Sequence, residues 1–158
     1  MFREMRRFKQ KLNVTECEEI LKRNTSGTLA LLGDGGYPYA VPLSYVYVSG
    51  KIFFHCAKAG HKIDAIKNYD KASFCIIDKD KIVPEEYTTY FRSVIAFGKI
   101  RIIADTLELE AALNILAKKY SPDQVEGRQK EIEQQISRVA MIELRIEHLS
   151  GKEAIELR

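Results

Sequence analysis

Short hydrophobic runs separated by glycine-rich turns dominate the first half of the chain. The run "GTLALLG" at 27–33 is bounded by glycines, and the "DGG" motif at Asp34–Gly36 favours a hairpin. The extended pattern resumes in "YPYAVPLSYVYV" at 37–48, and Ser49-Gly50 then turns the chain into "KIFFHCA" at 51–57. We therefore expect three consecutive strands joined by tight turns.

Proline and glycine positions add detail to the predicted strands. Pro38 and Pro42 cannot donate to a β-ladder, which indicates an edge strand or a bulge near Pro42. Further strands are expected at 72–78 and within 90–105, where the interior Gly98 suggests a kink or a close backbone approach.

The segment between these two later strands is polar and contains a proline. Residues 79–89 therefore predict a loop. Near the end of the chain, the alternation in "RVAMIELRIEHL" at 138–149 predicts a strand with its apolar residues mostly on one face, and "GKEAIELR" suggests a short last strand.

Four segments have helical signals. Thr15 and Glu18 form a T-x-x-E capping box that would start a helix through about Lys22. A short helix is expected at 61–69, and "TLELEAALNILAKKY" at 106–120 repeats leucine and alanine at three- and four-residue steps. A polar helix at 126–137 follows.

This order of elements predicts a mainly β, α+β protein of one domain, residues 1–158. Consecutive strands joined by tight turns indicate an antiparallel sheet, which we expect to close into a barrel with flanking helices.

Composition excludes several classes of protein. The net charge is only +3, from 25 basic and 22 acidic residues that are interspersed, so a nucleic-acid partner is not expected. The basic start of the chain lacks the apolar core of a secretory signal, and no apolar stretch approaches the roughly 20 residues that span a bilayer. The three cysteines form no CxxC pair, which favours a reducing, cytoplasmic setting. No metal site is expected, because His55 and Cys56 would point to opposite faces of a strand.

The segment "HCAKAGHK" at 55–62 is the strongest candidate for chemistry. The first N–H groups of a helix lack internal partners and attract anions. Gly60 would let a ligand approach the backbone, and Lys62 in the first turn is unfavourable unless an anion neutralises it. With Lys58 and His61 as further donors, the segment indicates a phosphate site. Lysines are also common at helix starts, so a purely structural role stays open.

His55 lies at the end of a predicted strand, a few residues from the proposed anion site. A single histidine there is usually structural. Its place on one strand face with Phe53, close to the anion site, instead favours contact with a ligand.

Several of these motifs, in this order, resemble one family. The run at 37–78, together with "LNVTECEEILKRNTSGTLALLGDGG" before it and "FRSVIAFGKIRII" after it, resembles the flavin-binding core of the pyridoxamine 5'-phosphate oxidase-like superfamily. More narrowly, it is similar to the nitroimidazole-resistance (Nim-type) branch. The resemblance covers about Met5 to Pro122.

The resemblance implies a split β-barrel homodimer that binds FMN between subunits. "AVPLSY" would line the flavin ring through backbone groups of Val41 and Leu43 and the hydroxyl of Ser44. His61 and Lys62 would hold the phosphate, and Ser93 would come from the second subunit. The full set of implied cofactor-binding residues is Val41, Pro42, Leu43, Ser44, His55, Cys56, Lys58, His61, Lys62 and Ser93, and His55 is also the candidate catalytic residue.

One departure from the family concerns the substrate. The vitamin B6 oxidases proper carry further basic residues on the strand equivalent to 37–48, which is neutral here. Oxidation of pyridoxamine phosphate is therefore not expected.

Two functions from different classes remain. The first is an FMN-dependent oxidoreductase that passes electrons from a reduced nicotinamide cofactor to a small substrate such as a nitroaromatic, with His55 donating a proton or a hydrogen bond. The second is a non-catalytic protein that stores or senses a flavin or another planar ligand. FAD or a deazaflavin would suit the same residues as FMN.

Overall fold

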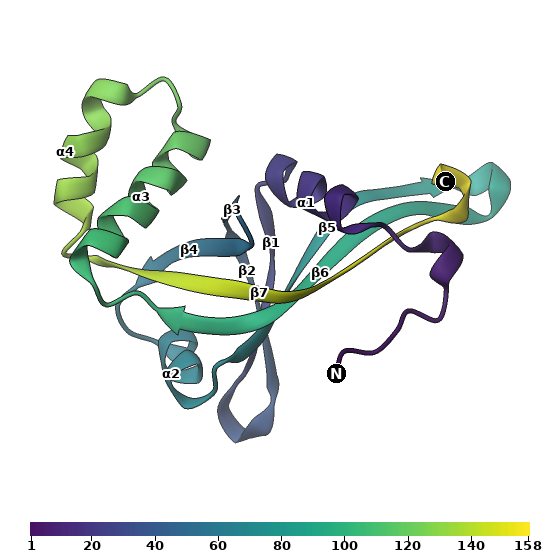
Figure 1. Cartoon of the computed structure of the whole chain (residues 1–158), viewed down its shortest axis with the longest axis horizontal. Coiled ribbons are helices and arrows are strands. Elements are labelled where there is room, and N and C mark those ends of the chain that lie inside the picture. Colours follow the sequence, from purple (N-terminus) through teal and green to yellow (C-terminus); the bar gives the residue numbers. More distant parts are fainter.

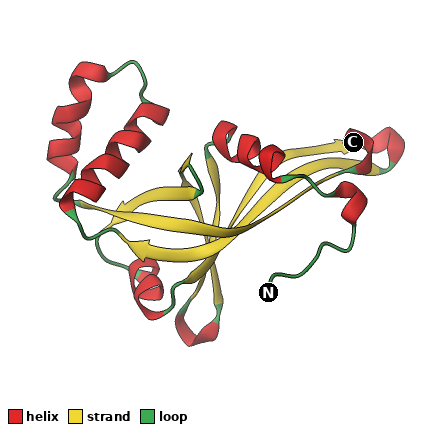
Figure 2. Cartoon of the chain, viewed as in Figure 1, coloured by secondary structure: helices red, strands yellow, loops and turns green.

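The computed structural model describes residues 1–158 and contains seven strands and four α-helices (Figures 1 and 2). The strands are β1 Ser26–Leu32, β2 Pro38–Ser44, β3 Val46–Val48, β4 Lys51–Ala57, β5 Lys71–Val83, β6 Thr88–Ile102 and β7 Val139–Glu153. The helices are α1 Val14–Arg23, α2 His61–Asn68, α3 Thr106–Tyr120 and α4 Val125–Gln135. None of these helices is both long enough and apolar enough to span a membrane.

All seven strands form one antiparallel sheet in the order β2-β1-β5-β6-β7-β4-β3. Its two edge strands, β2 and β3, follow one another in the chain and are separated only by Tyr45. The chain therefore passes from one edge of the curved sheet to the other at a single residue. The predicted mainly β, antiparallel split barrel with flanking helices is confirmed.

The expectation that hydrogen bonds close the barrel completely is wrong. β3 has three residues and pairs only with residues 51–53 of β4. The rest of β4, residues 54–57, has no strand partner on that side, and neither has β2 on the side away from β1. This leaves a split between β2 and the end of β4.

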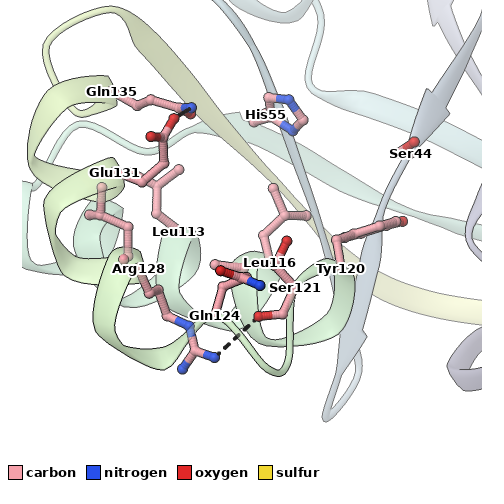
Figure 3. A pocket seen from close by; sticks show the side chains of 13 residues that line it. Ser44, His55, Leu113, Leu116, Tyr120, Ser121, Gln124, Arg128, Glu131 and Gln135 are labelled. Carbon is pink, nitrogen blue, oxygen red and sulfur yellow. Dashed lines mark hydrogen bonds between the residues drawn. The ribbon is translucent and has the colours of Figure 1, made fainter.

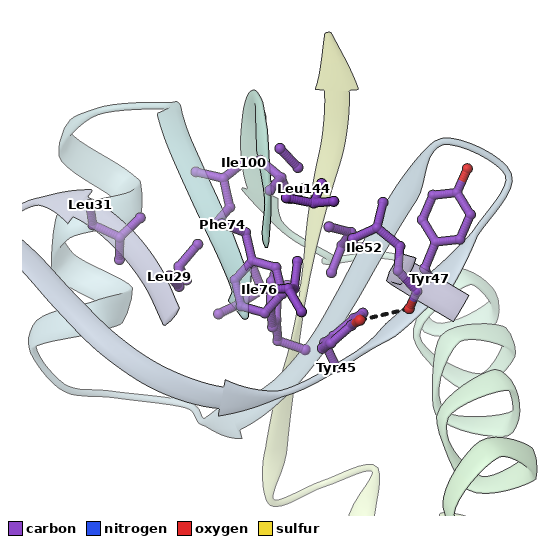
Figure 4. Close-up of a cluster of buried hydrophobic side chains, with 14 of the residues drawn as sticks. Leu29, Leu31, Tyr45, Tyr47, Ile52, Phe74, Ile76, Ile100 and Leu144 are labelled. Atoms are coloured by element: carbon purple, nitrogen blue, oxygen red, sulfur yellow. Dashed lines mark hydrogen bonds between the residues drawn. The ribbon is translucent and has the colours of Figure 1, made fainter. Parts of the chain in front are cut away.

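The barrel interior is packed around aromatic rings (Figure 4). Phe74 meets Tyr45 and Phe54 edge-on, with ring centroids 5.0 Å apart in both pairs. The hydroxyl of the fully buried Tyr45 donates to the carbonyl of Leu21 at 2.6 Å, which ties α1 to the barrel. Burial of such rings supplies a large share of the hydrophobic stabilisation.

A second, smaller core lies on the outer face of the barrel. There the α3–α4 hairpin packs on β3, β4 and β7 through Phe53, Leu113, Ile132 and Met141. β7 is consequently buried on both faces between residues 140 and 144, so the predicted one-sided alternation is wrong for this part of the strand.

The predicted loop at 79–89 is instead the tip of a long hairpin. β5 and β6 stay paired from Lys79↔Arg92 to Val83↔Thr88 and turn tightly at Pro84–Glu86. This arm extends beyond the barrel (Figure 1). The loop prediction is wrong because the polar sequence of this segment suits strands with little covering them as well as it suits a loop.

Three local predictions also have clear outcomes. The capping box of α1 uses Asn13 and Glu16, so the helix starts before Thr15.

β2 is an edge strand, as its prolines indicate, but its register with β1 is regular and has no bulge at Pro42. The strand irregularity does occur at Gly98, where a Cβ atom would collide with the carbonyl of Arg145.

A carboxylate at the base of the arm connects three elements. Asp78 accepts hydrogen bonds from Arg23 Nε at 2.8 Å, Asn24 Nδ2 at 2.7 Å and Arg92 Nη1 at 3.3 Å. Burial alone would raise the pKa of Asp78, but these three donors outweigh it and hold the pKa at about 2. The ionised form therefore stabilises the junction of α1, β5 and β6.

We predict that Asp78→Asn lowers the free energy of unfolding by about 2 kcal/mol at pH 7, the equivalent of the shift from 3.8 to about 2. Because the folded-state pKa is depressed, this stabilisation is complete above about pH 4 and is lost as the pH falls towards 2. Urea titrations at several pH values measure it, and Asp80→Asn on the exposed arm is the matched control. An equal difference between Asp78→Asn and the native protein at pH 7 and pH 2.5 would contradict the assignment.

Candidate functional site

The split in the barrel presents unpaired backbone groups from β2. Two hydrogen bonds show which residues of β2 direct their backbone groups towards β1. The N–H of Tyr45 donates to the carbonyl oxygen of Thr25 at 3.2 Å, and the N–H of Gly33 donates to the carbonyl oxygen of Tyr37 at 2.8 Å. Because hydrogen-bonded pairs alternate along a regular antiparallel ladder, the odd-numbered residues of β2 bond to β1. The even-numbered residues direct their free backbone groups into the split: Ala40 and Ser44 present both N–H and C=O, and Pro38 and Pro42 present only C=O.

The same reasoning identifies the free groups of β4. Ile146 N–H donates to Gly50 at 2.9 Å, so the even-numbered residues of β4 bond to β7. His55 and Ala57 lie beyond the end of β3, and their backbone groups have no strand partner. Edge groups of this kind are available to a ligand.

Ser44 and His55 line one cavity, which lies between the split and the α3–α4 hairpin (Figure 3). Its volume is about 490 Å³, within the range of small-molecule sites. Leu113, Leu116 and Ile132 supply apolar walls. The remaining lining residues are Ala117, Tyr120, Ser121, Gln124, Gly127, Arg128, Glu131 and Gln135.

The C-terminal end of α3, which lines this cavity, binds the backbone around Tyr45, where the chain crosses from β2 to β3. Tyr120 Oη lies 2.7 Å from the carbonyl oxygen of Tyr45 and 2.5 Å from that of Thr25, and it accepts from Tyr45 N–H at 3.1 Å. Lys119 donates to the carbonyl of Asn24, and its ammonium lies 4.3 Å from the centre of the Tyr45 ring. Burial lowers the pKa of Lys119 and raises that of Tyr120. One wall of the cavity is therefore anchored at the barrel split.

The start of α2 has the features expected of an anion site. Gly60 precedes the helix with φ 124°, a conformation that favours glycine, and no side chain caps the first turn. Neither Lys58 nor Lys62 takes part in an ion pair. Two cationic side chains without ion-pair partners and the first amide groups of α2 thus follow directly after the end of β4.

His61 has a contact that its sequence position did not suggest. Its ring stacks on Tyr39, with centroids 4.1 Å apart, and its Nε2 accepts from the N–H of Asp34 at 3.3 Å. A Cβ on Gly33 would approach the same nitrogen at 3.0 Å, so glycine allows this turn to come close. His61 therefore links α2 to the β1–β2 turn, and only its Nδ1 and backbone N–H remain for a ligand.

Other predicted site residues face away from the cavity. The side chains of Val41, Leu43 and Cys56 pack against the barrel core. Burial raises the pKa of the Cys56 thiol, and the Lys62 ammonium opposes this only in part, so the thiol is not activated. Within this chain Ser93 lies on β6 opposite Ile77 and Lys152 and does not line the cavity.

The α3–α4 lining was missed at the sequence level. A signal was present in α4: Gln124, Arg128, Glu131 and Gln135 follow one another at steps of four, three and four, which places polar side chains on one helical face. Nothing in the sequence says that this polar face turns towards the sheet. No group of three metal-binding side chains comes together in the structure.

Comparisons with known proteins agree on the fold. The model of the pyridoxamine 5'-phosphate oxidase family matches residues 13–153. No curated protein matches the sequence.

Many solved structures are similar, and three are informative. A candidate 5-nitroimidazole antibiotic resistance protein from Bacteroides thetaiotaomicron is 20% identical, with a TM-score of 0.76 over 90% of this chain and 86% of that one. An FAD-binding protein from Mesorhizobium loti is 24% identical, with a TM-score of 0.67 over 92% and 97%. An F420 reductase is 19% identical, with a TM-score of 0.58 over 84% and 94%. At these identities the likeness shows the fold alone.

Proposed function

Because the chain belongs to the pyridoxamine 5'-phosphate oxidase family, we propose that it is a flavin-binding oxidoreductase that uses the cavity beside His55. The observation that carries the proposal is the meeting of Ser44 and His55, from two different strands, at a cavity next to the split. The FAD-binding and F420-reductase relatives support a flavin-type cofactor, and the relative assigned to nitroimidazole resistance supports a nitroaromatic acceptor.

The residues present fit the polar parts of FMN. The first turn of α2, with Lys58 and Lys62, would hold the phosphate, since free amide groups and unpaired ammonium groups are suited to a dianion. The edge groups of Ala40, Pro42 and Ser44 would bind the polar edge of the ring. The resemblance assigned these backbone contacts to Val41 and Leu43. The backbone groups of those two residues bond to β1, so we assign the contacts to Ala40, Pro42 and Ser44 instead.

When bound, the flavin would supply the redox chemistry by taking a hydride from a reduced nicotinamide cofactor and passing electrons to a small acceptor. The protein would supply placement and a proton. His55 is exposed on the outer face of β4, so its imidazole can hold a proton or a hydrogen bond at the acceptor. Leu113, Leu116 and Ile132 would keep water from that part of the cavity.

FAD and a deazaflavin are the alternatives to FMN, because the anion site at α2 suits each of them. A non-catalytic flavin-storage protein is the alternative function. It is favoured by the absence of any ionisable side chain from the sheet side of the cavity other than His55.

We also propose a homodimer in which Ser93 of the partner subunit completes the site, since Ser93 does not reach the cavity of its own chain. Sedimentation velocity should give twice the chain mass of 18.1 kDa. A single species at the chain mass with flavin bound would refute the shared site.

The three free cysteines favour a cytoplasmic setting.

We predict that Lys62→Ala weakens FMN binding more than tenfold, because it removes a charge-assisted contact of roughly 1.5–3 kcal/mol. Fluorescence titration of the apoprotein measures the affinity. Lys67→Ala, an exposed lysine in the last turn of the same helix, is the control for a general loss of positive charge. Unchanged affinity in Lys62→Ala would remove Lys62 from the phosphate site.

We predict that His55→Ala leaves flavin bound but lowers the rate of nitroaromatic reduction at least about tenfold, because proton transfer or hydrogen bonding at the acceptor is lost. Steady-state turnover with reduced nicotinamide and a flavin absorbance spectrum measure the two effects separately. His148→Ala on β7, outside the cavity, is the control. Loss of the flavin itself would instead make His55 a cofactor ligand.

A further inference from the structure

Most of the residues by which α4 and its N-terminal cap line the cavity are polar. Gln124, Arg128, Glu131 and Gln135 line the cavity, while Val125 of the same helix is exposed to solvent. Only Ile132 of α4 is fully buried. Arg128 and Gln135 are half-buried, whereas Gln124 and Glu131 are exposed, so a ligand in the cavity would meet polar side chains from this helix.

Arg128 is the cationic residue of this cavity, and its charge has no acidic partner. Its Nη2 donates to the carbonyl oxygens of Ser121 at 3.4 Å and Pro122 at 3.2 Å, which lie in the turn after α3. No carboxylate forms an ion pair with it. Its Nε is shielded from solvent and has no hydrogen-bond partner. The guanidinium therefore keeps donor capacity that its own chain does not use, and an acceptor in the cavity that reached it would be favoured.

The acidic residue of the cavity does not neutralise Arg128. Glu131 accepts a hydrogen bond from Gln135 instead, and both lie towards the His55 end of the cavity, whereas the Arg128 guanidinium lies beside Ser121 (Figure 3). Seven residues of α-helix separate Arg128 from Gln135, or about 10 Å at 1.5 Å per residue. An aromatic ring with two substituents spans about this length.

We propose that Arg128 is a specificity-determining residue that binds an anionic substituent, such as a carboxylate, on the aromatic electron acceptor. The apolar walls of Leu113, Leu116 and Ile132 would hold the ring, and the reducible group would lie towards His55. The identity of this molecule as an electron acceptor rests on the proposed function. The preference for an anionic aromatic compound rests only on the cavity.

Calorimetric titration with 4-nitrobenzoate and its neutral counterpart 4-nitrobenzamide tests the inference without turnover. The native protein should bind the anion at least about tenfold more tightly. Arg128→Gln should abolish that difference, and Arg128→Lys should retain part of it because the charge remains even if the contacts to the α3–α4 turn change. Lys130→Gln, which removes an exposed charge from the same helix, should leave it intact.

Equal affinity of the native protein for the two compounds, or no binding of either, would overturn the inference. So would an unchanged preference in Arg128→Gln. A protein that prefers the anion, loses the preference in Arg128→Gln and yet binds no flavin would uphold this assignment while refuting the proposed oxidoreductase. The two proposals therefore fail by different results.

Discussion

The chain crosses from one edge of the sheet to the other at Tyr45, and the split in the barrel follows from this crossing. One residue carries the chain from β2 at one edge to β3 at the other, so the barrel is joined covalently where hydrogen bonds do not close it. Hydrogen bonds fix Tyr45 at both its backbone and its side chain. Its backbone groups bond to Thr25 and Tyr120, and its hydroxyl donates to Leu21. A crossing this short leaves the end of β4 and one side of β2 unpaired.

The candidate site is a direct consequence of that crossing. Unpaired edge groups occur where the barrel is split, and the α3–α4 hairpin covers the split because Tyr120 and Lys119 bind at the crossing itself. The hairpin brings a mixed wall to the cavity, apolar from α3 and polar from α4. The sheet therefore supplies His55 and the backbone contacts, and the helices supply the groups that would select a substrate.

Much of the fold could be predicted from the sequence because its signals are local. Turn residues such as Asp34–Gly36 and Ser49-Gly50 define hairpins, and the leucine pattern of 106–120 defines α3. The arm at 79–89 and the double-sided burial of β7 could not be predicted, because each depends on what covers a strand. The grouping of Gly60, Lys58 and Lys62 was predictable from adjacency. The presence of Arg128 in one cavity with Ser44 and His55 was not, since it depends on how the α3–α4 hairpin docks.

Flavin binding is tested first by the absorbance spectrum of the purified, untagged protein, with the released chromophore identified by mass spectrometry. We expect flavin absorption bands from the protein as isolated or after incubation with FMN, and release of the intact cofactor on denaturation. A colourless protein that takes up no FMN, FAD or deazaflavin would contradict it, and the split in the barrel would then serve some other ligand.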